Sequence, residues 1–250
     1  MNNETATFWD HLDELRDRLI RMIVVTVLLS VVAFCMKEWL FDVVLAPRTS
    51  AFITYRWMGI EPFSIHLMNT GLTEQFMIHV KTAFWVGFLL ASPYLLYELF
   101  AFVSPALYAN ERRYGIWIVG SAYMMFMVGT LLNYFLIFPL TVRFLGTYQV
   151  SPEVANMLTI QSYMDTLMMM SLVMGLVFEL PVVSALLGKM GLLRASLMRT
   201  YRRHAVVAIL VVAAIITPTT DAFTLFVVAL PIWLLYEVSI QLVRITEQNK

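Results

Sequence analysis

The chain turns at Phe102-Val-Ser-Pro-Ala-Leu-Tyr-Ala-Asn-Glu-Arg-Arg113, a short polar connection between two long apolar runs. Pro105 has no backbone N–H and disfavours helix at the residue before it, so the stretch predicts a structured turn. Glu111, Arg112 and Arg113 then open the next helix. Because arginine is common at the ends of membrane spans, interfacial anchoring is one interpretation of these charges.

The composition identifies the class of protein. Of 250 residues, 60% are hydrophobic and 14% are charged, whereas roughly a quarter of the residues in an average soluble domain are charged. The sequence therefore predicts an all-α polytopic membrane protein. A formal net charge of zero gives no electrostatic signature for nucleic acid. The single cysteine, Cys35, excludes an internal disulfide.

Six apolar segments are long enough, or nearly so, to enter a bilayer, which takes about 20 helical residues. The fifth segment would rise only about 20 Å, and the sixth carries Pro231. We expect these two to form a short hairpin, joined by Thr217-Pro-Thr-Thr-Asp221, that ends before the far surface. The predicted spans are about 20–36, 76–100, 114–138, 163–187, 205–217 and 222–243.

The distribution of lysine and arginine predicts the orientation. Most of these residues lie in the N-terminal arm, in the second and fourth connections and in the C-terminal tail. By the positive-inside rule, both termini and the turn at 101–113 face the cytoplasm. The connections at about 37–75 and 140–162 then form an outer cap. We expect a single membrane domain over 1–250, with residues 1–19 as a cytoplasmic amphipathic arm.

Charged residues inside the spans are candidates for function, because charge is costly in lipid. Glu179 precedes Pro181, whose ring interrupts helical hydrogen bonding, so we expect water or a partner there. A neutral Glu179 bonded inside the bundle is the alternative. Asp221, at the tip of the short hairpin, must be wetted or paired. Lys81 and Glu98 lie near span ends and are expected to snorkel to the interface.

Motifs for catalysis are absent from the sequence. It has no phosphate-binding Gly-x-x-x-x-Gly-Lys-Ser/Thr loop, no Cys or His cluster with metal spacing and no Gly-x-Ser-x-Gly turn. We therefore expect no enzyme activity, no cofactor and no metal. A secondary transporter or ion channel that uses Lys81, Glu179 and Asp221 as an ion path is an alternative function, although no internal repeat supports it.

The N-terminal arm offers a structural explanation for its own charges. Glu14 and Arg18 are four residues apart, as are Asp17 and Arg21. This is the spacing of helical ion pairs.

Six motifs, in order and over essentially the whole chain, resemble TatC, the multi-spanning core subunit of the twin-arginine protein translocase. The resemblance implies a cupped bundle of six helices, the last two short, with Pro47, Pro105, Pro139 and Pro181 as structural prolines. The motifs are His11-Leu-Asp-Glu-Leu-Arg-Asp-Arg-Leu19, Ala46-Pro47, Phe102-x-Ser-Pro-Ala-Leu-Tyr-x-x-Glu-Arg-Arg113, Tyr134-Phe-x-x-Phe-Pro139, Phe178-Glu-Leu-Pro181 and Thr217-Pro-x-x-Asp221.

This resemblance assigns a role to two carboxylates. In the family, the acids that match Glu14 and Glu111 bind the paired arginines of a signal peptide. A carboxylate can grip the planar guanidinium with two parallel hydrogen bonds, which lysine cannot reproduce. Arg16 and either Arg112 or Arg113 are expected to hold those carboxylates in place or to anchor the surface.

The resemblance also implies partners and a location. TatA-type and TatB-type single-span subunits would dock near the last two helices, through polar contacts at Glu179, Thr217, Asp221 and Thr224. Folded cargo would cross the bacterial cytoplasmic (inner) membrane, driven by the proton-motive force, with several copies of the chain in the complex. One departure is Leu225, because a glutamine is frequent at this position, four residues after the hairpin aspartate.

Overall fold

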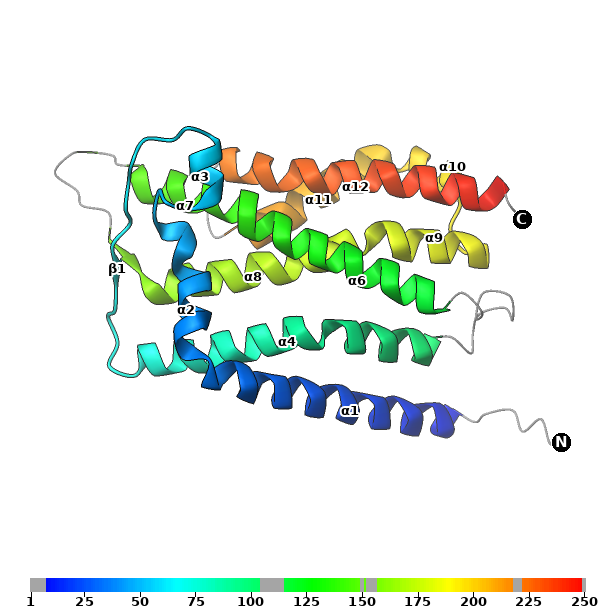
Figure 1. The fold of residues 1–250 in the computed structure, drawn as a ribbon. Coiled ribbons are helices and arrows are strands. Elements are labelled where there is room, and N and C mark those ends of the chain that lie inside the picture. Colours follow the sequence, from blue (N-terminus) through cyan, green and yellow to red (C-terminus); the bar gives the residue numbers. More distant parts are fainter. Residues whose placement is uncertain (1–7, 104–114, 149–150, 152–156, 218–221, 249–250) are drawn as a thin grey trace. The chain divides into compact units, whose positions relative to one another are not determined.

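The computed structural model describes residues 8–103, 115–148, 151, 157–217 and 222–248, and these are mostly helical (Figure 1). Two two-residue strands, β1 (Leu67–Met68) and β2 (Leu158–Thr159), are the exceptions among the described elements. The helices are α1 (Phe8–Cys35), α2 (Lys37–Leu45), η1 (Ala46–Arg48), α3 (Ile53–Trp57), α4 (Glu74–Val103), α6 (Gly115–Leu132), η3 (Asn133–Ile137), α7 (Phe138–Thr147), α8 (Ile160–Phe178), α9 (Leu180–Met190), α10 (Ala195–Thr200), α11 (Arg202–Ile216) and α12 (Ala222–Gln248).

Five helical segments in the described part of the chain are long and apolar enough to cross a membrane. The third joins α6, η3 and α7, and the fourth joins α8 and α9. The predicted polytopic, helical membrane class therefore agrees with the structure. The five segments are Leu12–Cys35, Glu74–Phe102, Gly115–Thr147, Ile160–Met190 and Ala222–Gln248.

The last two predicted spans differ from each other. Helix α11 has 15 residues, which gives a length of about 22 Å, and it is not among the five. Helix α12 has 27 residues and runs beyond the predicted end at 243, because residues that favour helix continue it after the apolar run ends. It contains Pro231 without interruption. A short final helix and a count of six spans are thus not confirmed.

The chain divides into two compact units. Unit 1 comprises Met1–Leu40 and His79–Tyr123, and it contains α1 and most of α4. Unit 2 comprises Phe41–Ile78 and Met124–Lys250.

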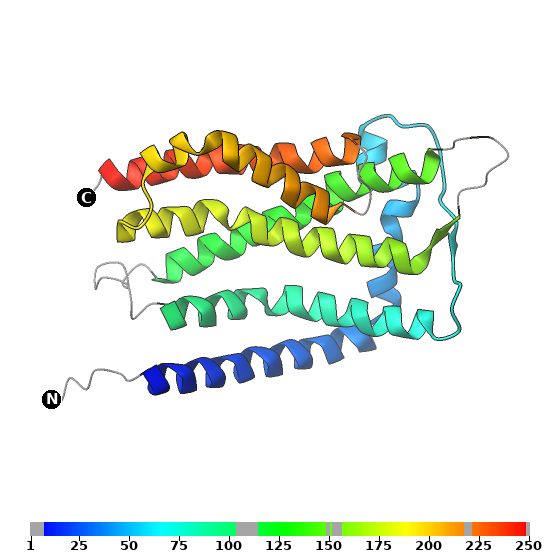
Figure 2. The same ribbon diagram turned by 180° about the vertical axis from the view of Figure 1, so that it is seen from behind.

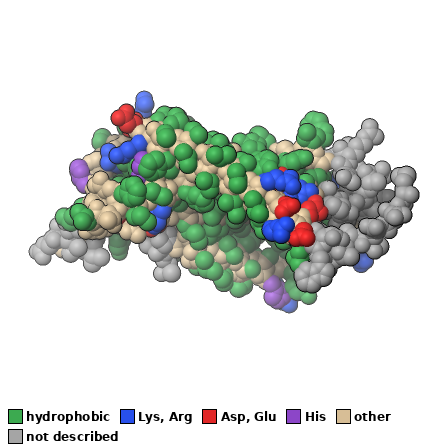
Figure 3. All heavy atoms as spheres, turned by 90° about the horizontal axis from the view of Figure 1, so that it is seen from below, with side chains coloured by type: hydrophobic (Ala, Val, Ile, Leu, Met, Phe, Trp, Pro, Cys, Tyr) green, Lys and Arg blue, Asp and Glu red, His purple; other side chains and the backbone are tan. Residues whose placement is uncertain are grey.

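In unit 1, α1 and α4 run side by side in opposite directions, so that the start of α1 lies beside the end of α4 (Figures 1 and 2). Their backbones approach closely at Gly87, where an added Cβ would lie 2.6 Å from the Cα of Ser30. Nearer the other end of α1, the ring of Phe34 stacks on His79 with centroids 4.0 Å apart. On the face seen in Figure 3, hydrophobic side chains cover most of the described surface and charged ones gather toward its two ends.

In unit 2, α8 supplies the centre of the hydrophobic core. Met164, Leu167, Met170 and Met174 are completely buried, at spacings of three or four residues that place them on one side of the helix. Residues from η3, α7, α11 and α12 complete this core. Between α6 and α7 the chain widens into one turn of π-helix, η3, which begins at the buried Asn133. Asn133 donates its side-chain amide to the hydroxyl of Ser171 at 2.8 Å.

The two long connections that were predicted to form one cap do meet within unit 2. Strands β1 and β2 pair in parallel, with Leu67 opposite Leu158. Tyr55 is fully buried in α3 and donates its hydroxyl to the carbonyls of Pro47 at 3.0 Å and Pro139 at 2.7 Å. Pro47 and Pro139 are both buried, and both were predicted to be structural. Their carbonyls accept hydrogen bonds from the same tyrosine.

Candidate functional site

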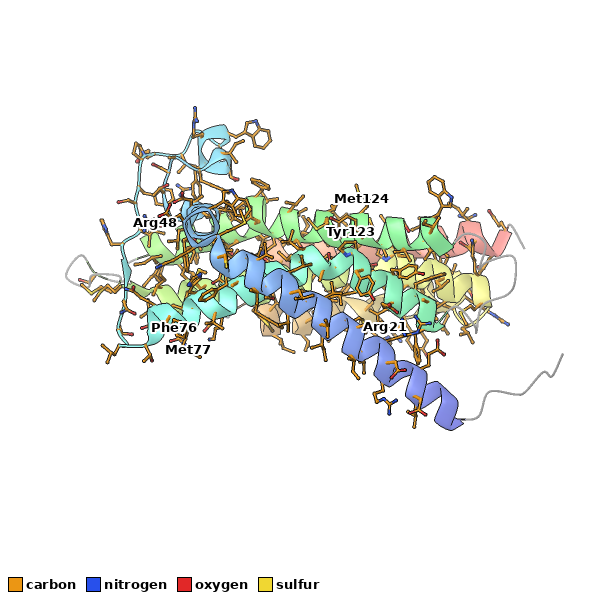
Figure 4. The ribbon with its side chains drawn as sticks, turned by 60° about the horizontal axis from the view of Figure 1, so that its bottom comes forward. Arg21, Arg48, Phe76, Met77, Tyr123 and Met124 are labelled. Carbon is orange, nitrogen blue, oxygen red and sulfur yellow. The ribbon has the colours of Figure 1, made fainter. Side chains whose placement is uncertain are left out.

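A network of charged side chains in unit 1 joins the start of α1 to the end of α4. Arg18 lies at its centre: Nε and Nη2 are 3.0 and 2.6 Å from Oε1 of Glu14, and Nη1 is 2.7 Å from Oε2 of Glu98. Tyr94 donates its hydroxyl to Oε1 of Glu98 at 2.7 Å. Nη1 of Arg21 lies 3.8 Å from that same oxygen, and Figure 4 shows Arg21 between α1 and the end of α4.

The network is graded from buried to exposed. The side chain of Glu98 is 4% exposed, that of Arg18 is 17% exposed and that of Glu14 is 39% exposed. All hydrogen bonds from Arg18 to Glu14 reach Oε1, so Oε2 of Glu14 keeps its lone pairs available to a further donor. With Arg21 the network holds two acids and two arginines, so its formal charges cancel.

Helical spacing explains how these residues meet. Glu14, Arg18 and Arg21 follow one another by four and three positions and share one side of α1, as Tyr94 and Glu98 do on α4. The predicted pair of Glu14 with Arg18 is confirmed.

Two other expectations for these charges are wrong. Glu98 does not snorkel to the interface, because Arg18 and Tyr94 bind its carboxylate where it is buried. Arg21 pairs with Glu98, and Asp17 with Arg16, so the predicted pair of Asp17 with Arg21 does not form. An acid near the C-terminal end of one helix and an arginine near the N-terminal end of its antiparallel neighbour are the sequence signal that was available.

The other residues predicted to bind the signal lie apart from this network or outside the described residues. Arg16 bonds the neighbouring acids Asp13 and Asp17, each at 3.3 Å, and its side chain is 65% exposed. It does not contact Glu14 within the described part of the chain. The predicted residues Glu111, Arg112 and Arg113, and also Pro105, fall in 104–114, outside the described residues.

Glu179 lies in unit 2 at the junction of α8 and α9, where Pro181 occupies the first turn of the second helix. The backbone remains bonded, since the N–H of Glu179 donates to Leu176 and its carbonyl accepts from Val183. Its Oε1 is buried and has no hydrogen-bond partner among the described residues. Buried carboxylate oxygens normally accept a hydrogen bond. Oε1 of Glu179 can therefore accept one from another molecule.

The polar residues of the predicted hairpin have separate surroundings. Thr217 is buried at the end of α11 and donates its hydroxyl to the carbonyl of Ala213 at 3.0 Å. Thr224 is fully buried in α12, and Leu225 packs against the core of unit 2. Asp221 lies outside the described residues. No group of three or more potential metal ligands occurs among the described residues.

The five long apolar helical segments define a multi-spanning membrane protein, in which two carboxylates, of Glu14 and Glu98, bind the guanidinium group of Arg18. Comparisons with known proteins identify the family. The chain matches the family model of the Sec-independent protein translocase protein (TatC) over residues 10–231. The chain belongs to the TatC family.

Relatives and solved structures agree with this assignment. The chain is 36% identical to the Sec-independent protein translocase protein TatC of Desulforapulum autotrophicum over 247 residues, which are 99% of this chain and 87% of the relative. It is 33% identical to that of Deinococcus radiodurans, with 96% and 87% of the two chains covered. A crystal structure of the twin arginine translocase receptor TatC is 32% identical, has a TM-score of 0.78 and covers 94% of this chain and 99% of that one. The protein is thus a membrane component of a protein translocase and not an enzyme.

Proposed function

We propose that this chain is the receptor subunit that binds the paired arginines of twin-arginine signal peptides through Glu14 and Glu111. The observation that carries this proposal is the geometry at Glu14, whose carboxylate already accepts two hydrogen bonds from the guanidinium of Arg18. Its second oxygen, Oε2, accepts no hydrogen bond from Arg18, and the side chain is 39% exposed, so it can accept from another guanidinium. A charge-assisted hydrogen bond of this kind is roughly twice as strong as a neutral one.

The fold supports the placement of both carboxylates on one side of the membrane. Glu14 lies in the first turns of α1, next to the end of α4 in unit 1 (Figure 1). The connection that carries Glu111 leaves α4 directly after Val103. The positive-inside rule assigns this side, and with it both termini, to the cytoplasm. Arg16, Arg112 and Arg113 then lie at the same membrane surface.

The proposal extends to the architecture and location. We take α11 as a sixth, short span, which gives the six-span topology and the cupped bundle that the resemblance implies. The whole chain is then a single membrane domain in the cytoplasmic (inner) membrane of a bacterium.

We further propose that partner subunits of the TatA and TatB type contact the polar positions Glu179, Thr217, Asp221 and Thr224. The buried, unpartnered Oε1 of Glu179 supports this, because a polar group of a partner span could satisfy it. Several copies of the chain would assemble with these partners and use the proton-motive force to move folded cargo.

Photo-crosslinking of a synthetic twin-arginine signal peptide to inverted membranes tests the receptor role. Glu14→Ala and Glu111→Ala should each reduce the adduct strongly, since loss of one partner of a bound arginine costs about 2–5 kcal/mol. Asp13→Ala is the matched control, because Asp13 is an acid in the same turn of α1 whose partner is Arg16. If both glutamate variants crosslink as well as the unaltered chain, the receptor role is refuted.

A further inference from the structure

The interaction of Arg18 with Glu14 has a consequence for signal binding. We infer that Arg18 is an internal competitor for the signal's arginine on Glu14, and that Glu98 is the positioning residue that draws Arg18 away when the signal binds. This inference rests on the proposed receptor function and deepens it. It assigns roles to two residues, Arg18 and Glu98, that the binding of paired arginines does not itself require.

The first step is the state of the Glu14 carboxylate. A guanidinium binds a carboxylate best with two parallel hydrogen bonds, one to each oxygen. In the structure, Oε1 of Glu14 is occupied by both Nε and Nη2 of Arg18, at 3.0 and 2.6 Å. Only Oε2 is open, so an incoming arginine can make a single hydrogen bond while Arg18 stays in place. Full two-point binding requires Arg18 to release Oε1.

Once Arg18 has released Glu14, it must pair with another group. A guanidinium cannot lose its charge, so Arg18 needs another acid. Glu98 is that acid, since its Oε2 already lies 2.7 Å from Nη1 of Arg18. Its carboxylate is fixed from the other side by the hydroxyl of Tyr94 at 2.7 Å. Arg18 can therefore leave Glu14 while it remains paired with a carboxylate.

The third step is the difference in exposure between the two acids. Glu98 is 4% exposed and Glu14 is 39% exposed. A pair with a buried acid is screened less by water and salt than a pair with an exposed one. Arg18 is thus held firmly by Glu98, and its bonds to Glu14 are the ones that a ligand from solution can replace. The exchange keeps the number of charge pairs constant.

This arrangement predicts opposite effects for two neutral substitutions. Arg18→Gln removes the competitor and should lower the half-saturating concentration of signal peptide. Glu98→Gln keeps the size of the side chain but removes the charge that attracts Arg18, which then binds Glu14 more tightly, so the half-saturating concentration should rise. Groups in direct contact are commonly coupled by amounts that correspond to roughly 2- to 160-fold in an equilibrium constant. A merely structural role would change both values in the same direction.

The experiment is a titration of a photoreactive twin-arginine signal peptide against inverted membranes that contain the full-length chain with its partner subunits. Arg18→Gln alone leaves the buried Glu98 with only Tyr94 and the more distant Arg21, so it risks poor folding. The double variant Arg18→Gln/Glu98→Gln removes both charges together and keeps the test decisive. It should bind the peptide at least as tightly as the unaltered chain. A twin-lysine peptide reports the background.

Several results would overturn the inference. Weaker binding by the double variant would show that Arg18 positions Glu14 for the ligand and does not compete with it. Unchanged or tighter binding by Glu98→Gln would show that Glu98 does not draw Arg18 away. Glu14→Ala is titrated in the same series to test the receptor role separately from the competition by Arg18. If Glu14→Ala abolishes binding but Arg18→Gln and Glu98→Gln do not have opposite effects, only the competition is refuted. If Glu14→Ala has no effect, the receptor role and the inference fail together.

Discussion

Gly87→Ala should push α1 and α4 of unit 1 apart. The backbone of α4 at Gly87 lies directly against Ser30 of α1: a Cβ on Gly87 would lie 2.2 Å from Oγ of Ser30, 2.5 Å from its backbone N and 2.6 Å from its Cα. Non-bonded carbons prefer about 3.5–4.0 Å. The helices would have to move apart by about 1 Å, because two of the three contacts are with backbone that cannot rotate away.

The size of the effect follows from two opposing contributions. Overpacking of a close contact costs typically about 1–3 kcal/mol, and a clash with backbone belongs at the upper end. Alanine in place of glycine inside a helix stabilises the folded protein by roughly 0.5–1 kcal/mol. The net loss in the free energy of unfolding is about 2 kcal/mol, which for a chain of this size lowers the melting midpoint by about 4–8 °C.

Melting of the purified protein in detergent, followed by size-exclusion chromatography, measures this change. Gly120→Ala is the matched control, since Gly120 also lies inside a helix, is exposed and has nothing within 4 Å of an added Cβ. It should melt at or slightly above the midpoint of the unaltered chain. Adding Ser30→Gly to Gly87→Ala removes the hydroxyl and leaves the backbone contacts, so it should not restore stability. Equal melting midpoints for Gly87→Ala and Gly120→Ala would show that α1 and α4 do not depend on a close approach at Gly87.

Two further substitutions test buried hydrogen bonds in unit 2. Tyr55→Phe leaves the carbonyls of Pro47 and Pro139 without their donor and should cost about 1–3 kcal/mol in melting experiments. Burial raises the pKa of Tyr55 in the folded protein. The contribution of its hydroxyl to the free energy of unfolding is therefore complete below about pH 10 and is lost as the pH rises above that value. Between about pH 9 and pH 11, Tyr55→Phe should lose less stability than the unaltered chain. Asn133→Ala should likewise destabilise the protein by about 1–3 kcal/mol, and the double variant with Ser171→Ala should cost less than the sum of the two single changes, since these side chains bond each other. A double variant that equals that sum would show that the bond contributes nothing.

The first four predicted spans overlap helical segments that are long and apolar enough to cross a membrane, but hydrophobic length did not predict where these helices end. Helix α1 begins at Phe8, within the predicted arm, because the arm and the first span form one continuous helix. The apolar run sets the part of a helix that fits lipid, whereas the polar residues around it decide how far the helix continues. The same reason explains α12, which extends to Gln248.

The sequence predicted that the two long connections meet, but it did not predict the structure within them. Helices α2 and α3 and the pairing of β1 with β2 consist of short segments with no clear hydrophobic period. Their position depends on long-range contacts such as the hydroxyl of Tyr163 with the carbonyl of Val44, at 3.1 Å and 119 residues apart in the chain. Contacts of this kind have no local signal.

At the candidate site, local spacing predicted the half of the network that lies on one helix. The pair of Glu14 with Arg18 follows from positions four apart in α1. The pair of Arg18 with Glu98 requires knowing which helix lies beside α1 and how far the two are shifted along each other. Hydropathy does not contain that information. Glu98 was therefore expected to extend to the membrane interface, whereas in the structure it is buried and pairs with Arg18.

The close approach of α1 and α4 also explains why the network can be exchangeable without being weak. A buried carboxylate such as Glu98 is tolerated only while it is paired, because removal of one partner leaves an uncompensated charge. Arg18 is that partner, and its side chain reaches Glu98 across from α1. The buried half of the network therefore fixes Arg18 on α4, and the exposed half, on Glu14, is left to compete with solvent and ligand. A site built in this way responds to a second arginine by replacing a hydrogen bond, which requires no new buried charge and no separation of the helices.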